Sequence, residues 1–233
     1  MIAPEALLAD CELALGRSTL YGVTARLLSG PAGALDPALF AELARAAREH
    51  PGYTAVADDA EAAARLAADP ALTPRVLEQE FTHLFRRARA APYEGSYLPA
   101  ARASQELADV AGFLRAFGTT SRQEKPDHVV SELEFMALLC LKESIARGNG
   151  QAPEAAVCRD AQAKFLKDHL GRWLDAFHAA VVASSRFPLY PAIAQAASHL
   201  VAADAVVLGV EPGILGGSSP EEPEDAPKCG VGG

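Results

Sequence analysis

The stretch Pro126-Asp-His-Val-Val-Ser-Glu-Leu-Glu-Phe-Met-Ala-Leu-Leu-Cys-Leu141 decides the fold of this chain. From Phe135 to Leu141 the run would be apolar on almost every side of a helix. A helix that is hydrophobic all round is buried, so the segment predicts a central core helix. Asp127 follows a proline and is expected to act as the N-cap, which leaves His128 in the first turn. Asp127 and His128 would then be either structural residues or functional groups at the open end of a buried helix.

Around this segment the chain carries further helical patterns and no run that alternates long enough for a sheet. We therefore predict an all-α fold, a single-domain bundle of roughly eight to ten helices around the buried central helix, over residues 1–210. Residues 211–233 are dominated by Gly, Pro, Ser and Glu. This composition cannot bury enough apolar surface to order itself, so we expect a flexible, disordered tail.

Composition and charge limit the classes of partner. The chain has 233 residues, half of them hydrophobic, and a formal net charge of -9. An acidic surface disfavours nucleic acid and anionic membranes and suits a basic peptide, although simple solubility is the commoner reason for such a charge. We expect no apolar stretch long enough to span a bilayer, because the best, Leu200 to Val210, is broken by Asp204.

The cysteines and the N-terminus indicate the compartment. None of the four cysteines forms a Cys-x-x-Cys pair, which argues against zinc and thioredoxin-type sites. The first residues lack the basic start of a secretory signal peptide. We therefore expect a soluble, cytoplasmic protein in a reducing environment.

Two patterns could carry catalysis. Glu80-Phe-Thr-His83 is a Glu-x-x-His unit of the kind used in di-iron bundles, but a second unit is missing, so a solvated helix face is the expected role. His128 and Glu132 are four residues apart and could share a face. A helical metal-dependent enzyme using Glu80, His83, His128 and Glu132 is therefore the alternative function. A nucleotide-binding regulator ranks last, since the sequence has no phosphate loop.

The loop at residues 91–99 favours a binding role instead. Pro92, Tyr93 and Tyr97 offer a rigid amphipathic surface directly after a helix that carries Phe81 and Phe85. Such aromatic surface often receives peptides, and the alternative is that the loop packs on the core.

Three segments, in this order and spacing, resemble the TorD/DmsD-type (NarJ-related) family of redox-enzyme maturation chaperones. They are Glu80-Phe81-x-x-Leu84-Phe85, Pro92-Tyr93-Glu94-x-Ser96-Tyr97-Leu98 and Pro126-Asp127-His128-x-x-x-Glu132-Leu133-Glu134-Phe135-Met136. A later run, Phe165-Leu166-x-x-His169-Leu170-x-x-Trp173-Leu174, is also similar to the family's C-terminal half. The resemblance covers about residues 10 to 205.

The resemblance implies an all-helical cytoplasmic chaperone rather than an enzyme, without a metal or cofactor of its own. Such chaperones bind the twin-arginine leader, or the apo form, of a molybdenum-cofactor oxidoreductase subunit of the DMSO reductase superfamily, and hold back export until the cofactor is inserted. The family's leader-binding positions fall here on Asp127, His128, Pro92 and Tyr93. We add Tyr97, Glu132, Phe81 and Phe85 as peptide-binding candidates. A monomer or a domain-swapped homodimer would be compatible with this role.

Overall fold

The computed structural model describes residues 4–123 and 125–213, so most of the predicted tail lies outside the described residues. Every regular element in this part of the chain is a helix, which confirms the all-α prediction. The elements are α1 (Pro4–Leu28), α2 (Pro31–Ala34), α3 (Pro37–Arg48), η1 (Pro51–Tyr53), α4 (Thr54–Ala67), α5 (Pro74–Phe81), η2 (Thr82–Arg86), η3 (Glu94–Tyr97), α6 (Ala100–Ala116), α7 (Val129–Gly148), α8 (Ala152–Phe165), η4 (Leu166–Leu170), α9 (Gly171–Ser184) and α10 (Leu189–Leu208).

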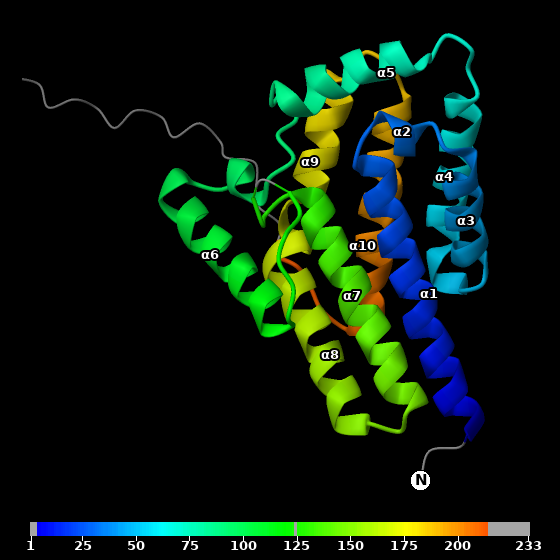
Figure 1. Cartoon of the computed structure of the whole chain (residues 1–233), viewed down its shortest axis with the longest axis vertical. Coiled ribbons are helices and arrows are strands. Elements are labelled where there is room, and N and C mark those ends of the chain that lie inside the picture. The colour runs from blue at the N-terminus through cyan, green and yellow to red at the C-terminus, as the bar shows by residue number, and fades with distance from the viewer. Residues whose placement is uncertain (1–3, 124, 214–233) are drawn as a thin grey trace, which may run out of the picture.

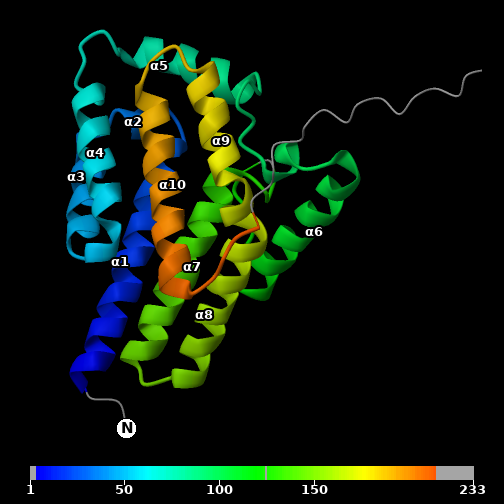
Figure 2. The same cartoon turned by 180° about the vertical axis from the view of Figure 1, so that it is seen from behind.

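Helix α7 forms the centre of the bundle. It lies between α1 and α8 in both views of the molecule (Figures 1 and 2). The α1 helix runs antiparallel to α7, because Cys11 near its start bonds to Ser144 while Ser18 reaches the carbonyl of Ala137. Helices α3 and α4 pair with each other, α4 packs on α10, and α10 on α9. Helix α6 projects to one side of this bundle (Figure 1).

The predicted burial of the central helix is confirmed for most of its length. Its most buried apolar side chains are at most 1% exposed, and these are Val129, Val130, Leu133, Phe135, Met136, Leu139 and Cys140. The apolar run was expected to stay inside as far as Leu141, but Leu141 is 38% exposed and Ile145 is 54% exposed. The first half of the helix is therefore buried except at Glu134, which is exposed, and the C-terminal half has an open apolar face.

A buried ionic cluster ties α1 to α10. The Arg17 guanidinium donates to both carboxylate oxygens of Asp204, from Nε at 2.5 Å and from Nη2 at 2.7 Å. The hydroxyls of Tyr21 and Tyr53 donate to the same carboxylate at 2.8 and 2.7 Å. Asp204 is thus fully buried but has four donors, which offsets the cost of removing its charge from water.

This cluster also explains why the last helix, α10, continues through Asp204. Helix α10 has 20 residues and, by length and composition alone, could cross a membrane, contrary to our expectation that no segment was long enough. The sequence suggested that Asp204 interrupts the apolar run, whereas the helix continues through it because the carboxylate is paired inside the bundle. Half of the apolar stretch of α10 is buried within the protein, as is usual for a core helix.

Candidate functional site

The structure brings together two of the predicted segments, the 91–99 loop and the start of α7. The backbone N–H of Glu94 donates to the Asp127 carbonyl at 2.9 Å, and that of Val129 donates to the Pro92 carbonyl at 2.8 Å. These bonds form an isolated antiparallel bridge between Tyr93 and His128. The loop is therefore fixed on the end of the central helix, with Pro92 buried and the rings of Tyr93 and His128 half-buried.

Asp127 does not cap the central helix, contrary to prediction. Its side chain is 4% exposed and turns towards the loop, where Oδ2 accepts the backbone N–H of Gly95 at 3.1 Å. Its second oxygen, Oδ1, has no hydrogen-bond partner within the described residues. Burial raises the pKa of this carboxyl above its usual value. The sequence could not show that a loop amide would compete with the helix for this acceptor.

His128 is the N-cap instead. Its Nδ1 accepts the backbone N–H of Val130 at 3.1 Å, so this nitrogen must be unprotonated. Burial lowers the pKa of the imidazole to about 4, so the ring is neutral at pH 7. The ring packs edge-on against Tyr93, with centroids 5.2 Å apart, and Lys125 places its ammonium 5.1 Å from the Tyr93 centroid. The face of the Tyr93 ring already receives a cation.

Glu132 lies deeper and does not pair with His128. It is fully buried, its Oε2 accepts the indole N–H of Trp173 at 3.0 Å, and its Oε1 lacks a partner within the part of the chain described. Burial, and then the neighbouring charge of Glu94, raise its pKa well above the usual value. Tyr97 stacks on the same indole, with ring centroids 5.4 Å apart. Glu132 therefore holds the Trp173 indole on which Tyr97, a residue of the loop, is stacked.

The sequence analysis missed a buried pair next to this site. Glu94 and His169 are both fully buried, and Glu94 Oε2 lies 3.1 Å from His169 Nδ1. The hydrogen bond and charge of Glu94 raise the pKa of His169 despite the opposing effect of burial. The two residues are 75 positions apart, so no local spacing indicates the contact. Both occur in the segments that carry the family resemblance, which is the only signal that could have selected them.

Phe85 belongs to the core, and Phe81 is partly buried and packs against that core. Phe85 is 8% exposed and stacks on Phe177, with centroids 6.0 Å apart, while Phe81 packs edge-on against Phe85 at 5.0 Å. Phe177 in turn contacts Trp173 at 5.7 Å, and Trp173 contacts Tyr97. A continuous row of rings therefore runs along α9 from the two phenylalanines to the loop.

The Glu-x-x-His unit holds a turn instead of facing solvent as predicted. Glu80 is fully buried and accepts hydrogen bonds from the Ser185 hydroxyl at 3.0 Å and from the Arg186 backbone and Nε at 2.7 and 2.6 Å. His83 Nε2 lies 3.1 Å from the Ser184 carbonyl. The unit therefore fastens α5 and η2 to the turn between α9 and α10.

The four residues of the metal-enzyme alternative do not form one cluster. Among residues 4–123 and 125–213, one group of side chains has potential ligand atoms within 4.8 Å of one another, namely Glu94, Glu106 and His169. The guanidinium groups of Arg102 and Arg172 lie 2.9 and 3.4 Å from Glu106 Oε1 and already compensate its charge. None of Glu80, His83, His128 and Glu132 belongs to this group.

Comparison with known families identifies the chain's relationship. The model of the family described as nitrate reductase delta subunit matches residues 42–179. The chain belongs to this family. The selenate reductase assembly chaperone protein of Thauera selenatis is 35% identical over 181 residues, which cover 71% of this chain and 92% of that protein. No solved structure matches the chain.

Two further relatives have related names. The chlorate reductase assembly chaperone protein of Ideonella dechloratans is 35% identical over 54% of this chain and 72% of its own length. The perchlorate reductase assembly chaperone protein of Dechloromonas aromatica is 32% identical over 48% of this chain and 50% of its own length. These relatives are assembly chaperones rather than catalysts, so the predicted membership of the redox-enzyme maturation chaperones is confirmed.

Proposed function

We propose that this protein binds the catalytic subunit of a molybdenum-cofactor oxidoreductase of the DMSO reductase superfamily, through its twin-arginine leader, its apo form or both. It acts in the cytoplasm, as a monomer or a domain-swapped homodimer, and assists cofactor insertion before export. The names of the relatives, which assemble selenate, chlorate and perchlorate reductases, support a client that reduces a similar oxyanion.

The observation that carries the leader-binding part is the joining of the 91–99 loop to the start of α7. At this junction the Tyr93 ring accepts a cation on its face and lies against His128. Behind them, Asp127 keeps one buried carboxylate oxygen without a donor in the described part of the protein. A leader arginine offers a flat cation for the ring and five N–H donors for the carboxylate, so both groups suit the same ligand. To reach Asp127 the arginine must displace the edge of the loop.

The direct test is titration of a synthetic twin-arginine leader peptide into the wild-type protein and a Tyr93→Leu variant, by calorimetry. Leucine keeps apolar bulk but removes the ring, so affinity should fall by about 1 kcal/mol, or roughly fivefold. Val157→Ala, at a side chain 59% exposed on α8, serves as the control and should bind normally. Equal affinities in all three proteins would contradict leader binding at this junction.

A further inference from the structure

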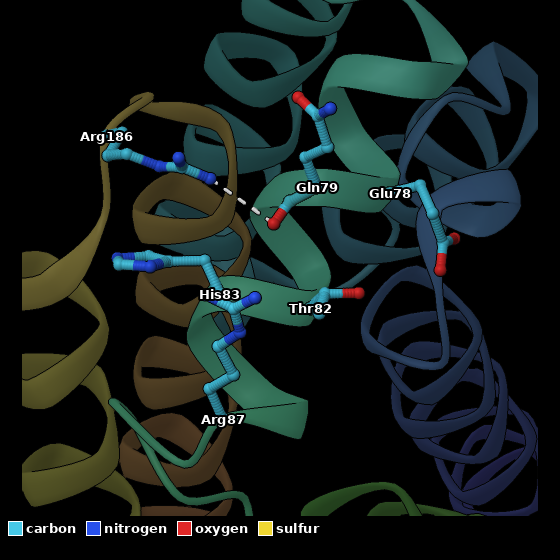
Figure 3. A pocket seen from close by; sticks show the side chains of 6 residues that line it. All are labelled: Glu78, Gln79, Thr82, His83, Arg87 and Arg186. Atoms are coloured by element: carbon cyan, nitrogen blue, oxygen red, sulfur yellow. Dashed lines mark hydrogen bonds between the residues drawn. The ribbon is translucent and has the colours of Figure 1, made fainter.

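A surface pocket of about 350 Å³ lies at the opposite end of the ring row from the loop, where η2 meets the turn after α9. Figure 3 shows the side chains that line it, which are Glu78, Gln79, Thr82, His83, Arg87 and Arg186. The side chains of His83 and Arg186 extend on one side of the pocket, with Arg87 below them, whereas Glu78 points away on the other side. The pocket is therefore basic on a chain with a net charge of -9.

The charges in this pocket are unequally neutralised. Glu78 already pairs with Arg86, at 2.9 Å. Arg186 is held by Glu80 through Nε at 2.6 Å and by the Gln79 carbonyl through Nη2 at 3.3 Å, which fixes its guanidinium at the rim. Arg87 is exposed, and its side chain makes no hydrogen bond or ion pair with any described residue. A ligand with negative charge would therefore find one fixed and one free guanidinium group.

We propose that this pocket binds the carboxylates of an acidic peptide segment. Guanidinium groups pair with carboxylates through two parallel hydrogen bonds, and the neighbouring Gln79 and Thr82 add neutral donors. The ligand has the opposite charge to a twin-arginine leader, so this is a second site that does not depend on the leader-binding proposal.

The chain itself contains a segment of this chemistry. The sequence Glu221-Glu-Pro-Glu-Asp225 holds four carboxylates in five residues. Pro212 lies against Gly171 at the start of α9, while Ser184 at the end of α9 contacts His83. With 14 residues α9 is about 21 Å long. The chain between Gly213 and Glu221 can span up to roughly 27 Å, so this run is long enough to reach the pocket. A second source is an acidic segment of the client.

The test uses a fluorescently labelled synthetic peptide with the sequence of residues 218–227. The host is the full chain in which Glu221, Glu222 and Glu224 are changed to Gln and Asp225 to Asn, so that its own run cannot compete. Fluorescence anisotropy at low salt should show binding. Arg87→Gln in this host should weaken it about two- to fivefold, as expected for a partly exposed ion pair. Arg75→Gln is the matched control, because Arg75 is an exposed arginine of α5 outside the pocket.

Comparison with the wild-type chain distinguishes the two sources. Weaker peptide binding by the wild-type chain would show that its own run occupies the pocket, whereas equal binding would assign the pocket to an acidic segment of another protein. Absence of binding, or an equal loss in Arg87→Gln and Arg75→Gln, would overturn the proposal. Leader affinity measured on the Arg87→Gln protein should not fall, which keeps this result separate from the leader-binding proposal.

Discussion

Two buried polar clusters in this protein differ in how completely they are paired. In the α1–α10 cluster, both oxygens of Asp204 accept two hydrogen bonds each, from Arg17, Tyr21 and Tyr53. In the loop cluster, formed by Asp127, Glu132, Glu94 and their partners, each of these three carboxylates keeps one oxygen without a donor in the described residues.

Under the proposed function, this difference distinguishes a cluster with a structural role from a cluster with a binding role. Buried polar groups are nearly always hydrogen-bonded, and each exception costs free energy. The α1–α10 cluster stabilises the bundle, because its groups are satisfied within the protein. The loop cluster lies beneath a surface loop, so a ligand could supply the missing donors and recover that free energy on binding.

The largest effect is expected for a substitution that breaks the α1–α10 cluster. Asp204→Ala leaves Arg17, which is 1% exposed, as a buried charge without its main partner. Removing one member of a buried pair typically costs about 3–5 kcal/mol of unfolding free energy, which urea denaturation would measure. Glu49→Ala, which removes the exposed partner of Arg45, is the control and should cost less than about 1 kcal/mol. A similar small loss in both variants would mean that the cluster is not what holds α10 in place.

The next-largest expected effect is the loss of stability at low pH that depends on His128. The pKa of this imidazole is about 4 in the folded protein and 6.5 ordinarily, so below pH 6.5 the unfolded chain binds a proton that the folded protein does not. The contribution of the neutral His128 ring to the free energy of unfolding is therefore complete above pH 6.5. It is lost as the pH falls towards 4, and the loss amounts to at most about 3 kcal/mol.

The measurement is urea denaturation of wild type and His128→Asn between pH 4 and pH 7. Asparagine can still cap the helix but does not titrate in this range. The stability difference between the two proteins should therefore change with pH in favour of the variant as acid is added. Parallel curves would show that the imidazole is not buried in the neutral form.

The central helix could be predicted from the sequence, whereas the pairing at its start could not. An apolar run such as Phe135 to Leu139 is buried against whatever surrounds it, so its fate does not depend on a particular partner. The direction of the Asp127 side chain depends on an amide 32 residues away, at Gly95. Local capping rules describe competition within the helix and do not include that distant donor.

The same limit applies to the Glu-x-x-His unit. On a helix alone, Glu80 and His83 fall on the side away from Phe81, which predicts exposure. Glu80 is buried because a turn 105 residues later covers it and supplies its donors. The family resemblance nevertheless assigned the loop and the helix start to one shared role in leader binding, which periodicity alone could not do.

A smaller effect tests whether the loop cluster meets a ligand. Asp127→Asn keeps an oxygen for the Gly95 N–H but removes the charge. Leader affinity should fall by about 1.5 kcal/mol, or roughly tenfold, as for a hydrogen bond to a charged group, while unfolding free energy changes by less than about 1 kcal/mol. Calorimetric titration and thermal melts on the same preparation measure both. A lower melting temperature with unchanged leader affinity would make Asp127 structural.

The smallest effect is expected for Glu132→Gln in the loop cluster, and the same substitution at Glu143 in the α1–α10 cluster provides the comparison. Glu143 is 1% exposed and belongs to the α1–α10 cluster, since its Oε2 lies 3.5 Å from Arg17 Nη1. It also accepts hydrogen bonds from Arg147 at 2.7 Å and from Gln162 at 2.9 Å. Glu143→Gln removes a charge that the buried Arg17 guanidinium requires and should cost about 3 kcal/mol of unfolding free energy or more. Glu132→Gln removes no charge if the raised pKa keeps this carboxyl protonated, and it retains an acceptor for the Trp173 indole.

The pH dependence of stability shows whether Glu132 is protonated in the folded protein. With a raised pKa in the folded protein, its contribution to stability is complete below its usual value of 4.5 and is lost as the pH rises above it, because the unfolded chain then releases a proton that the folded protein retains. At pH 4.5 Glu132→Gln should therefore differ from wild type by less than about 1 kcal/mol. Towards pH 7 the variant should gain relative to wild type, since glutamine does not titrate. A large loss of unfolding free energy at neutral pH, like that of Glu143→Gln, would instead mean that Glu132 is ionised in the folded protein.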